Sequence, residues 1–329
     1  MQKVSLNIAA LHLVQKLCEE AEKYNVTVEE AEAGTTLIDA GINAEGGYFA
    51  GEIITEICLG GYGKAKVTPI QYGDTILPSV FVLTDHPALS TLGSQFAGWQ
   101  IKGEGFSAIA SGPARALALK PKHLYEKLNY KEEAQTAVLV LETEKKPPEH
   151  IIEQIAEKCK VTPKNLFLIT FSTTSLAGAT QVSGRIVETG MHKLERLGLD
   201  PLVVKHAWGY APIVPIHPRS GEAMGRTNDS ILYGGVTNYT LEYEDELKLE
   251  NIVKQAPSSS SKMLQEARKL AEKNPRFLEI FEEAGFDFYK IDPNVFAPAV
   301  VVVNNIKTGK TFRAGSLDTD LLKESLGLS

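Results

Sequence analysis

The 329-residue chain contains only three cysteines, Cys18, Cys58 and Cys159, and no two of them lie near each other in the sequence. Isolated cysteines argue against a disulfide framework and do not have the paired spacing of a zinc cluster. The seven histidines form no HxH or HxxxH arrangement. The sequence therefore gives no support for a metal site, and we expect none.

Long apolar runs are also absent. The longest, such as FAPAVVVV at residues 296–303, are too short to span a bilayer. The N-terminal residues mix charges into apolar positions, unlike a signal peptide, so we expect a cytoplasmic protein with no membrane partner. The 34 Lys and Arg residues are outnumbered by 41 Asp and Glu residues, which gives a net charge of −7. Without a basic stripe, binding to nucleic acid is not expected.

Hydrophobic residues at 43% and charged residues at 23% are typical of a soluble globular protein. TAVLVLETE at residues 136–144 and NLFLITF at residues 165–171 read as strands, and PPEHIIEQIAEKCK between them reads as a helix. Such a unit predicts a parallel crossover. A hairpin is expected within residues 296–315. The alternation of elements indicates a mixed α/β fold.

The length and the order of elements indicate two lobes that share the chain in an intertwined way. We place an approximate division between one lobe of residues 1–130 plus the C-terminal hairpin 296–329, and a second lobe of residues 131–295. No local composition shift marks the boundary, and no internal repeat is present.

QVSGRIVETGMHKLERLG at residues 181–198 reads as a helix with charges near its start. Helical spacing places Gln181, Arg185, Glu188 and His192 on one face, with Arg185 and Glu188 as neighbours three residues apart. Two interpretations are open. The pair could be an exposed ion pair, or it could be an acid and the partner that tunes it at the mouth of a strand-to-helix junction.

Spacing alone favours an exposed pair that contributes ~0.3–0.5 kcal/mol. The preceding strand, however, is strongly apolar, and the flanking residues are small enough to leave space for a ligand. Desolvation raises the pKa of a carboxyl group, whereas a neighbouring arginine lowers it. Such opposed effects are a way of poising a carboxyl group for proton transfer.

A second candidate segment is SGPARALALKPK, which begins at Ser111. Ser111-Gly112-Pro113 is a favourable helix start, since serine caps and proline occupies the first turn. Free N–H groups there could hold an anion, with Arg115 and Lys120 close behind. From spacing alone, a plain capped helix is the preferred interpretation.

The segment AMGRTNDSILYGG at residues 223–235 is polar, flanked by glycine and followed by strand-like residues. Asn228 and Asp229 could line a cleft or could cap a turn, and the residue types do not decide between the two.

Together these segments resemble the methenyltetrahydromethanopterin cyclohydrolase family. The resemblance is carried in order by TDHPALSTLGSQFAGWQI, SGPARALALKPK, QVSGRIVETG, AMGRTNDSILYGG and FDFYKIDPNVFAPA, and DAGINAEGGYFAGEIITEICLGG near the N-terminus also fits. It covers essentially the whole chain.

The resemblance implies reversible hydrolysis of N5,N10-methenyl-tetrahydromethanopterin to the N5-formyl compound in one-carbon metabolism. It implies an α/β fold of two lobes with a large pocket between them, and homo-oligomers, trimers among them. It also implies that no metal or prosthetic group is needed, because the carrier is the substrate. The family's catalytic pair corresponds here to Arg185 and Glu188.

The same resemblance suggests which residues contact the substrate. The start of the Ser111 helix, with Arg115 and Lys120, is assigned to the carrier's phosphate-bearing tail, and Ser94 and Gln95 to the pterin. Further substrate-binding candidates are Gln181, Asn228 and Asp229.

Two other functions compete with this one. A dehydrogenase acting on the same carrier would need a strand followed by GxGxxG and a helix, and the chain has no such segment. A non-catalytic pterin-binding protein would use the same pocket residues without chemistry.

Overall fold

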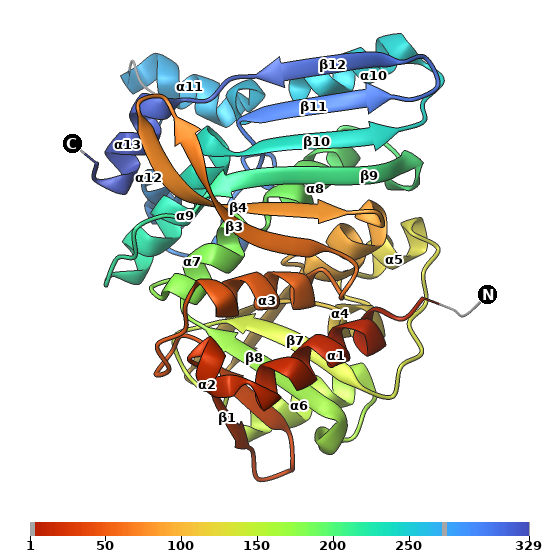
Figure 1. The fold of residues 1–329 in the computed structure, drawn as a ribbon, viewed down its shortest axis with the longest axis vertical. Coiled ribbons are helices and arrows are strands. Elements are labelled where there is room, and N and C mark those ends of the chain that lie inside the picture. Colours follow the sequence, from red (N-terminus) through yellow and green to blue (C-terminus); the bar gives the residue numbers. More distant parts are fainter. Residues whose placement is uncertain (1–3, 272–274, 329) are drawn as a thin grey trace. The chain divides into compact units, whose positions relative to one another are not determined.

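The structure is a computed structural model that describes residues 4–271 and 275–328. The chain divides into two compact units, one of residues 1–65 and 88–181 and the other of residues 66–87 and 182–329. In the described ranges each unit is built on one six-stranded sheet (Figure 1). The mixed α/β fold predicted from the sequence is confirmed.

The first unit contains the N-terminal helices and the predicted crossover. Its helices are α1 (Leu6–Glu19), α2 (Ala21–Tyr24), α3 (Tyr48–Cys58), the π-helix η1 (Leu89–Gln95), α4 (Ala114–Ala118), α5 (Lys122–Lys127), α6 (Glu149–Cys159), the 3-10 turn η2 (Pro163–Asn165) and α7 (Leu176–Ser183). Its strands are β1 (Thr27–Glu30), β2 (Thr36–Asp39), β5 (Trp99–Gly103), β6 (Phe106–Ser111), β7 (Ala137–Glu142) and β8 (Leu166–Phe171).

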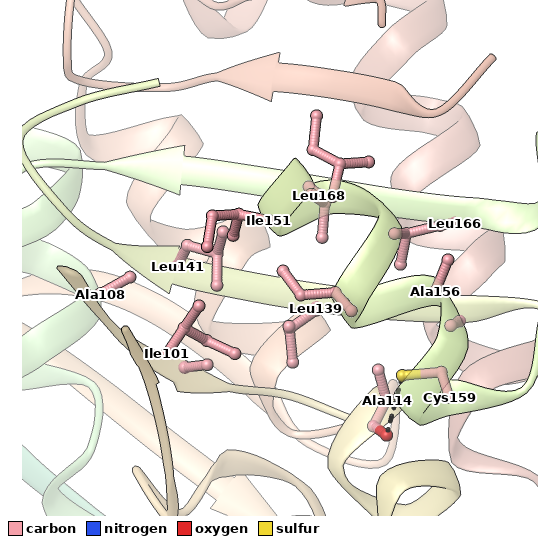
Figure 2. Close-up of a cluster of buried hydrophobic side chains, with 14 of the residues drawn as sticks. Ile101, Ala108, Ala114, Leu139, Leu141, Ile151, Ala156, Cys159, Leu166 and Leu168 are labelled. Atoms are coloured by element: carbon pink, nitrogen blue, oxygen red, sulfur yellow. Dashed lines mark hydrogen bonds between the residues drawn. The ribbon is translucent and has the colours of Figure 1, made fainter. Parts of the chain in front are cut away.

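The strands of the first unit follow the order β1-β2-β8-β7-β6-β5. β7 and β8 pair in parallel and are connected by α6, so the predicted parallel crossover is confirmed. Alternate side chains of β7 point toward α6, because successive residues of a strand face opposite sides. Figure 2 shows Leu139 and Leu141 packing there with Ile151 of α6. Helices α1 and α3 also contact β7.

The second unit holds the segment that carries Arg185 and Glu188. Its strands are β3 (Lys64–Tyr72), β4 (Thr75–Thr84), β9 (Val204–Pro212), β10 (Val236–Leu241), β11 (Val300–Asn305) and β12 (Lys310–Gly315). Its helices are α8 (Ile186–Arg196), η3 (Pro201–Val203), α9 (Ser220–Gly234), α10 (Glu246–Gln255), η4 (Ser258–Ser260), α11 (Lys262–Ala271), α12 (Phe277–Glu283), η5 (Phe288–Lys290) and α13 (Thr319–Leu326).

The second sheet runs in the order β12-β11-β10-β9-β4-β3. The predicted C-terminal hairpin is confirmed, since β11 and β12 pair antiparallel. Helix α8 packs against β9 and β10, and a Cβ at Gly209 would lie 3.3 Å from Val187 Cγ2 of α8. The neighbouring Trp208 therefore points to the opposite face, where it stacks between Phe81 and Tyr210 and is 39% exposed.

The division of the chain differs from the one drawn from the sequence. Strands β11 and β12 join β10, so the C-terminal hairpin lies with residues 182–295 and not with residues 1–130. Residues 131–181 instead belong to the first unit, because β7 and β8 extend the sheet of β2 and β6. Strand pairing between distant segments decides which residues belong to each unit. The hydrophobic periodicity of the sequence does not show which strands pair.

Along the described ranges, every helix is too short or too polar to serve as a transmembrane span.

Candidate active site

The segment predicted as one helix from residue 181 is two helices in the structure. Helix α7 ends at Ser183 and α8 begins at Ile186, with Arg185 as its N-cap residue. The Ser183 hydroxyl donates to the Pro212 carbonyl at 2.8 Å, and Gly184 follows, a residue that disfavours helix continuation. The break places Glu188 in the first turn of α8, where the helix dipole stabilises a carboxylate.

Arg185 and Glu188 are in contact and nearly buried. Arg185 Nη1 lies 3.4 Å from Glu188 Oε2, and the two residues are 7% and 5% exposed. This excludes the exposed ion pair that spacing alone favoured. The separation is longer than the ~2.7–2.9 Å of a strong charged hydrogen bond. A small part of each side chain remains exposed to solvent.

Helix α8 is fixed to the second unit along its inner face and at its far end. Ile186, Val187 and Met191 are fully buried. At the C-terminal end, the buried Lys193 Nζ donates to the Asn294 carbonyl at 2.8 Å. Arg196 Nε donates to Asn294 Oδ1 at 3.1 Å. Burial lowers the pKa of Lys193.

In the first unit, three predicted substrate-binding residues from separate segments converge on Cys58. The Ser94 hydroxyl donates to the Cys58 carbonyl at 2.6 Å. Gln181 Nε2 donates to Cys58 Sγ at 3.3 Å, and Ser111 Oγ lies 3.6 Å from the same sulfur. All four residues are buried. Sequence reasoning considered Cys58 only as a possible metal or disulfide residue, so it missed this cluster.

Comparison with known proteins agrees with the motifs. The sequence model of the family described as Cyclohydrolase (MCH) matches residues 5–326. The chain belongs to this family. A methenyltetrahydromethanopterin cyclohydrolase of Methanothermobacter marburgensis is 44% identical over 99% of this chain and 100% of its own length. The proteins of that name from Methanothermobacter thermautotrophicus and Methanocaldococcus jannaschii are each 43% identical, over 99% and 98% of this chain.

In this member of the cyclohydrolase family, Ser111 does not cap a helix. Ser111 is the last residue of β6, and the following helix α4 has only five residues, with Pro113 at its N-cap and no side-chain cap. Gly112 takes a φ of +101° between them, a conformation that favours glycine. The predicted helix start with Ser111 as its cap is therefore wrong, and a contact of Ser111 with the carrier stays a prediction.

Arg115 is fully buried and turned toward the protein interior. Its Nη1 donates to the carbonyls of Ser94 at 2.8 Å and Leu92 at 3.3 Å, at the C-terminal end of η1. The guanidinium carbon lies 5.3 Å from the centre of the Phe96 ring and 5.9 Å from that of Tyr125. Arginine suits the C-terminal end of a helix because the carbonyls there are left without helical partners. The structure thus gives Arg115 a capping role, and its contact with the tail of the carrier stays a prediction.

The helix that Arg115 caps is a π-helix, a rare element that is frequent at functional sites. The Phe96 N–H donates to the Thr91 carbonyl at 2.9 Å, five residues back. The Tyr125 hydroxyl donates to the Gly93 carbonyl at 3.0 Å. These bonds hold Ser94 and Gln95, the two residues that the sequence assigned to the pterin. Gln95 is buried and Lys120 is half-buried.

The segment from residue 223 is helical, which the sequence interpretation missed, because α9 runs from Ser220 to Gly234. Asp229 is fully buried and binds neighbouring helices: it accepts the Phe277 N–H at 2.7 Å and the Ser325 hydroxyl at 2.6 Å. These bonds give Asp229 a structural role, and its contact with substrate stays a prediction. Asn228 is nearly buried and donates to the Met224 carbonyl at 2.9 Å.

The titration of Asp229 leads to a stability prediction. Burial raises its pKa from 3.8 to about 7, against the opposing effects of Ser325, Phe277 and Arg276. The folded state therefore holds a proton that the unfolded chain releases, and Asp229 contributes stability at low pH that is lost as pH rises toward 7. Asp229→Asn keeps an acceptor for Phe277 without this titration. We expect the melting temperature of the wild type, relative to that of the variant, to fall between about pH 4 and about pH 7 and to level off above that range. A difference that does not change with pH would contradict the assignment.

Asp85 is part of a surface pair. Its Oδ1 lies 2.7 Å from His206 Nδ1, and both side chains are more than half exposed. Exposed pairs of this kind contribute little to stability.

Proposed function

We propose that the chain catalyses the reversible hydrolysis of N5,N10-methenyl-tetrahydromethanopterin to the N5-formyl compound. The observation that carries this proposal is the nearly buried Arg185–Glu188 contact in the first turn of α8, in a chain that belongs to the Cyclohydrolase (MCH) family. Relatives at 43–44% identity bear the name of this activity. A carboxylate reached by solvent at a fixed place is the group that such a hydrolysis requires.

The chemistry needs only a positioned water molecule and a base. The methenyl carbon is already electrophilic, because its positive charge is shared between N5 and N10. Glu188 would accept a proton from water as the new C–O bond forms, which gives a neutral carbinolamine. The C–N10 bond then breaks, Glu188 returns its proton to N10, and the hydroxyl proton leaves as the formyl C=O forms. One proton is released in total, which balances the lost cationic charge.

Arg185 would orient the carboxylate through the 3.4 Å contact without removing its capacity to take a proton. Gln95, Gln181, Asn228 and Lys120 stay as predicted substrate contacts. Ser94 and Ser111 also stay predicted substrate contacts, and we propose that their bonds to Cys58, like that of Gln181, hold the surrounding segments in place.

We further propose that no metal or prosthetic group takes part, because the amidinium carbon needs no Lewis acid for attack by water. The proposed setting is the cytoplasm, where the pterin carrier is the substrate. We also propose a homo-oligomer, as the family resemblance implies. Two apolar residues paired across β4 and β9, Leu83 and Trp208, are about 40% exposed, and this exposed apolar surface supports the proposal of a homo-oligomer.

The purified chain should consume the methenyl chromophore of the substrate over many turnovers, and the N5-formyl compound should appear in equal amount. A non-catalytic pterin-binding protein would instead perturb the chromophore once, in proportion to the protein added. Stoichiometric binding without turnover would therefore overturn the proposed hydrolysis. Parallel assays with the methenyl-tetrahydrofolate analogue would define how much of the recognition depends on the carrier.

A further inference from the structure

We propose that Tyr239 is a positioning residue for Glu188. Its hydroxyl holds the first turn of α8 in place, so that the Glu188 carboxylate stays aligned for proton transfer. This inference rests on the proposed role of Glu188. It adds a residue that the sequence motifs did not indicate.

Tyr239 lies on β10 beneath α8 and is fully buried. Its hydroxyl donates to the carbonyl of Val187 at 2.8 Å. Val187 is the residue directly before Glu188, so this hydrogen bond ties the backbone that carries the carboxylate to a central strand of the sheet. A tyrosine ring has few rotatable bonds, and one packed in a core therefore makes a rigid support.

Gly190 gives the second geometric argument. A Cβ at this position would lie 2.2 Å from the Tyr239 hydroxyl oxygen, and 3.2 Å from both Pro298 Cγ and Thr237 Oγ1. Glycine is unfavourable in the interior of a helix. At position 190 the absence of a side chain leaves the space that the Tyr239 hydroxyl occupies. The tyrosine therefore approaches the helix backbone directly, one turn from the start of α8.

The electrostatics agree with this placement. Burial raises the pKa of Tyr239 well above its ordinary value, and the charge of Glu188 raises it further. The phenol thus stays protonated and remains a donor over the range in which an enzyme works. Because the two groups interact, a displacement of one changes the surroundings of the other.

The second unit offers a matched control. Tyr233 is also buried, and its hydroxyl donates to the Pro275 carbonyl at 2.6 Å, away from α8. Tyr239→Phe and Tyr233→Phe therefore each remove one buried hydroxyl-to-carbonyl hydrogen bond. Only the first of these bonds holds the turn that carries Glu188.

We would measure kcat, KM with the methenyl substrate and the melting temperature for both variants. Circular dichroism would give the folded fraction of each sample, so that kcat can be expressed per folded molecule. Misplacing a reacting group by a fraction of an ångström to 1 Å costs up to about 100-fold, so we expect kcat of Tyr239→Phe to fall about 10- to 100-fold. Its KM should stay near that of the wild type. Tyr233→Phe should lose thermal stability but keep its kcat.

An equal kcat for the two variants would overturn the positioning role, and so would a raised KM with unchanged kcat for Tyr239→Phe. Glu188→Gln, assayed in parallel, separates this inference from the proposed function. If Glu188→Gln is inactive and the two tyrosine variants behave alike, only the inference fails. If Glu188→Gln remains active, the proposed role of Glu188 fails as well.

Discussion

Glu188→Gln should lower kcat for the methenyl substrate by about 10²–10⁴-fold, the usual contribution of general acid–base catalysis. Glutamine has nearly the same size and can still accept a hydrogen bond from Arg185, which lies 3.4 Å away. It cannot take the proton that water must lose. Binding should persist, because the substitution preserves the size and shape of the side chain, and loss of the chromophore in a stopped-flow assay would report the rate.

The matched control for this substitution is Glu195→Gln, which removes a carboxylate from the same helix without touching the first turn. Its kcat should stay within about twofold of the wild type, as for most substitutions away from a reacting group. Near-normal turnover of Glu188→Gln would make the Arg185–Glu188 contact a structural ion pair. The search would then move to Asp85, which is paired with His206.

Arg115→Met should destabilise the first unit by about 3–5 kcal/mol, because a hydrogen bond from a charged donor contributes roughly 1.5–3 kcal/mol. Arg115 donates to both the Leu92 and the Ser94 carbonyls. Methionine has no such donor, so both carbonyls would lose their hydrogen bonds from the guanidinium group. The loss of the contacts with the Phe96 and Tyr125 rings adds to the cost. Urea unfolding followed by circular dichroism would measure the change.

Lys120→Ala is the comparison, because Lys120 was assigned to the same substrate tail but is half-buried. Its unfolding free energy should change by less than about 0.5 kcal/mol. If Arg115 bound the tail of the carrier instead, Arg115→Met would raise KM and leave stability within about 1 kcal/mol of the wild type. That pattern would restore the assignment made from the sequence.

Several parts of the fold follow from local sequence pattern. Continuous apolar runs on either side of a proline-initiated helix predicted the β7-α6-β8 crossover, and the C-terminal hairpin was also predicted. Helical spacing correctly made Arg185 and Glu188 neighbours. In each case the information lies within a few residues, where backbone geometry relates spacing directly to position.

The polar segment around Asn228 and Asp229 shows where local pattern fails. Its residue types left open whether Asn228 and Asp229 line a cleft or cap a turn, and the structure shows the segment as part of the long helix α9. The polar side chains are buried because the neighbouring helices supply partners: the Phe277 N–H and the Ser325 hydroxyl both donate to Asp229. Tertiary contacts of this kind override residue propensity, and the segment itself gives no sign of them.

By itself, the sequence determined the mixed α/β class, the family and the pair of residues for which we propose the chemistry. The tertiary structure alone decided which side chains support that pair and which only stabilise the fold. Tyr239 meets Val187 across 52 positions of sequence, and Gln181 meets Cys58 across 123. Contacts this distant arise from strand pairing and packing. They leave no periodic signal along the chain, so only the folded backbone shows that Arg115 points to the end of a π-helix and that Tyr239 lies beneath the turn that carries Glu188.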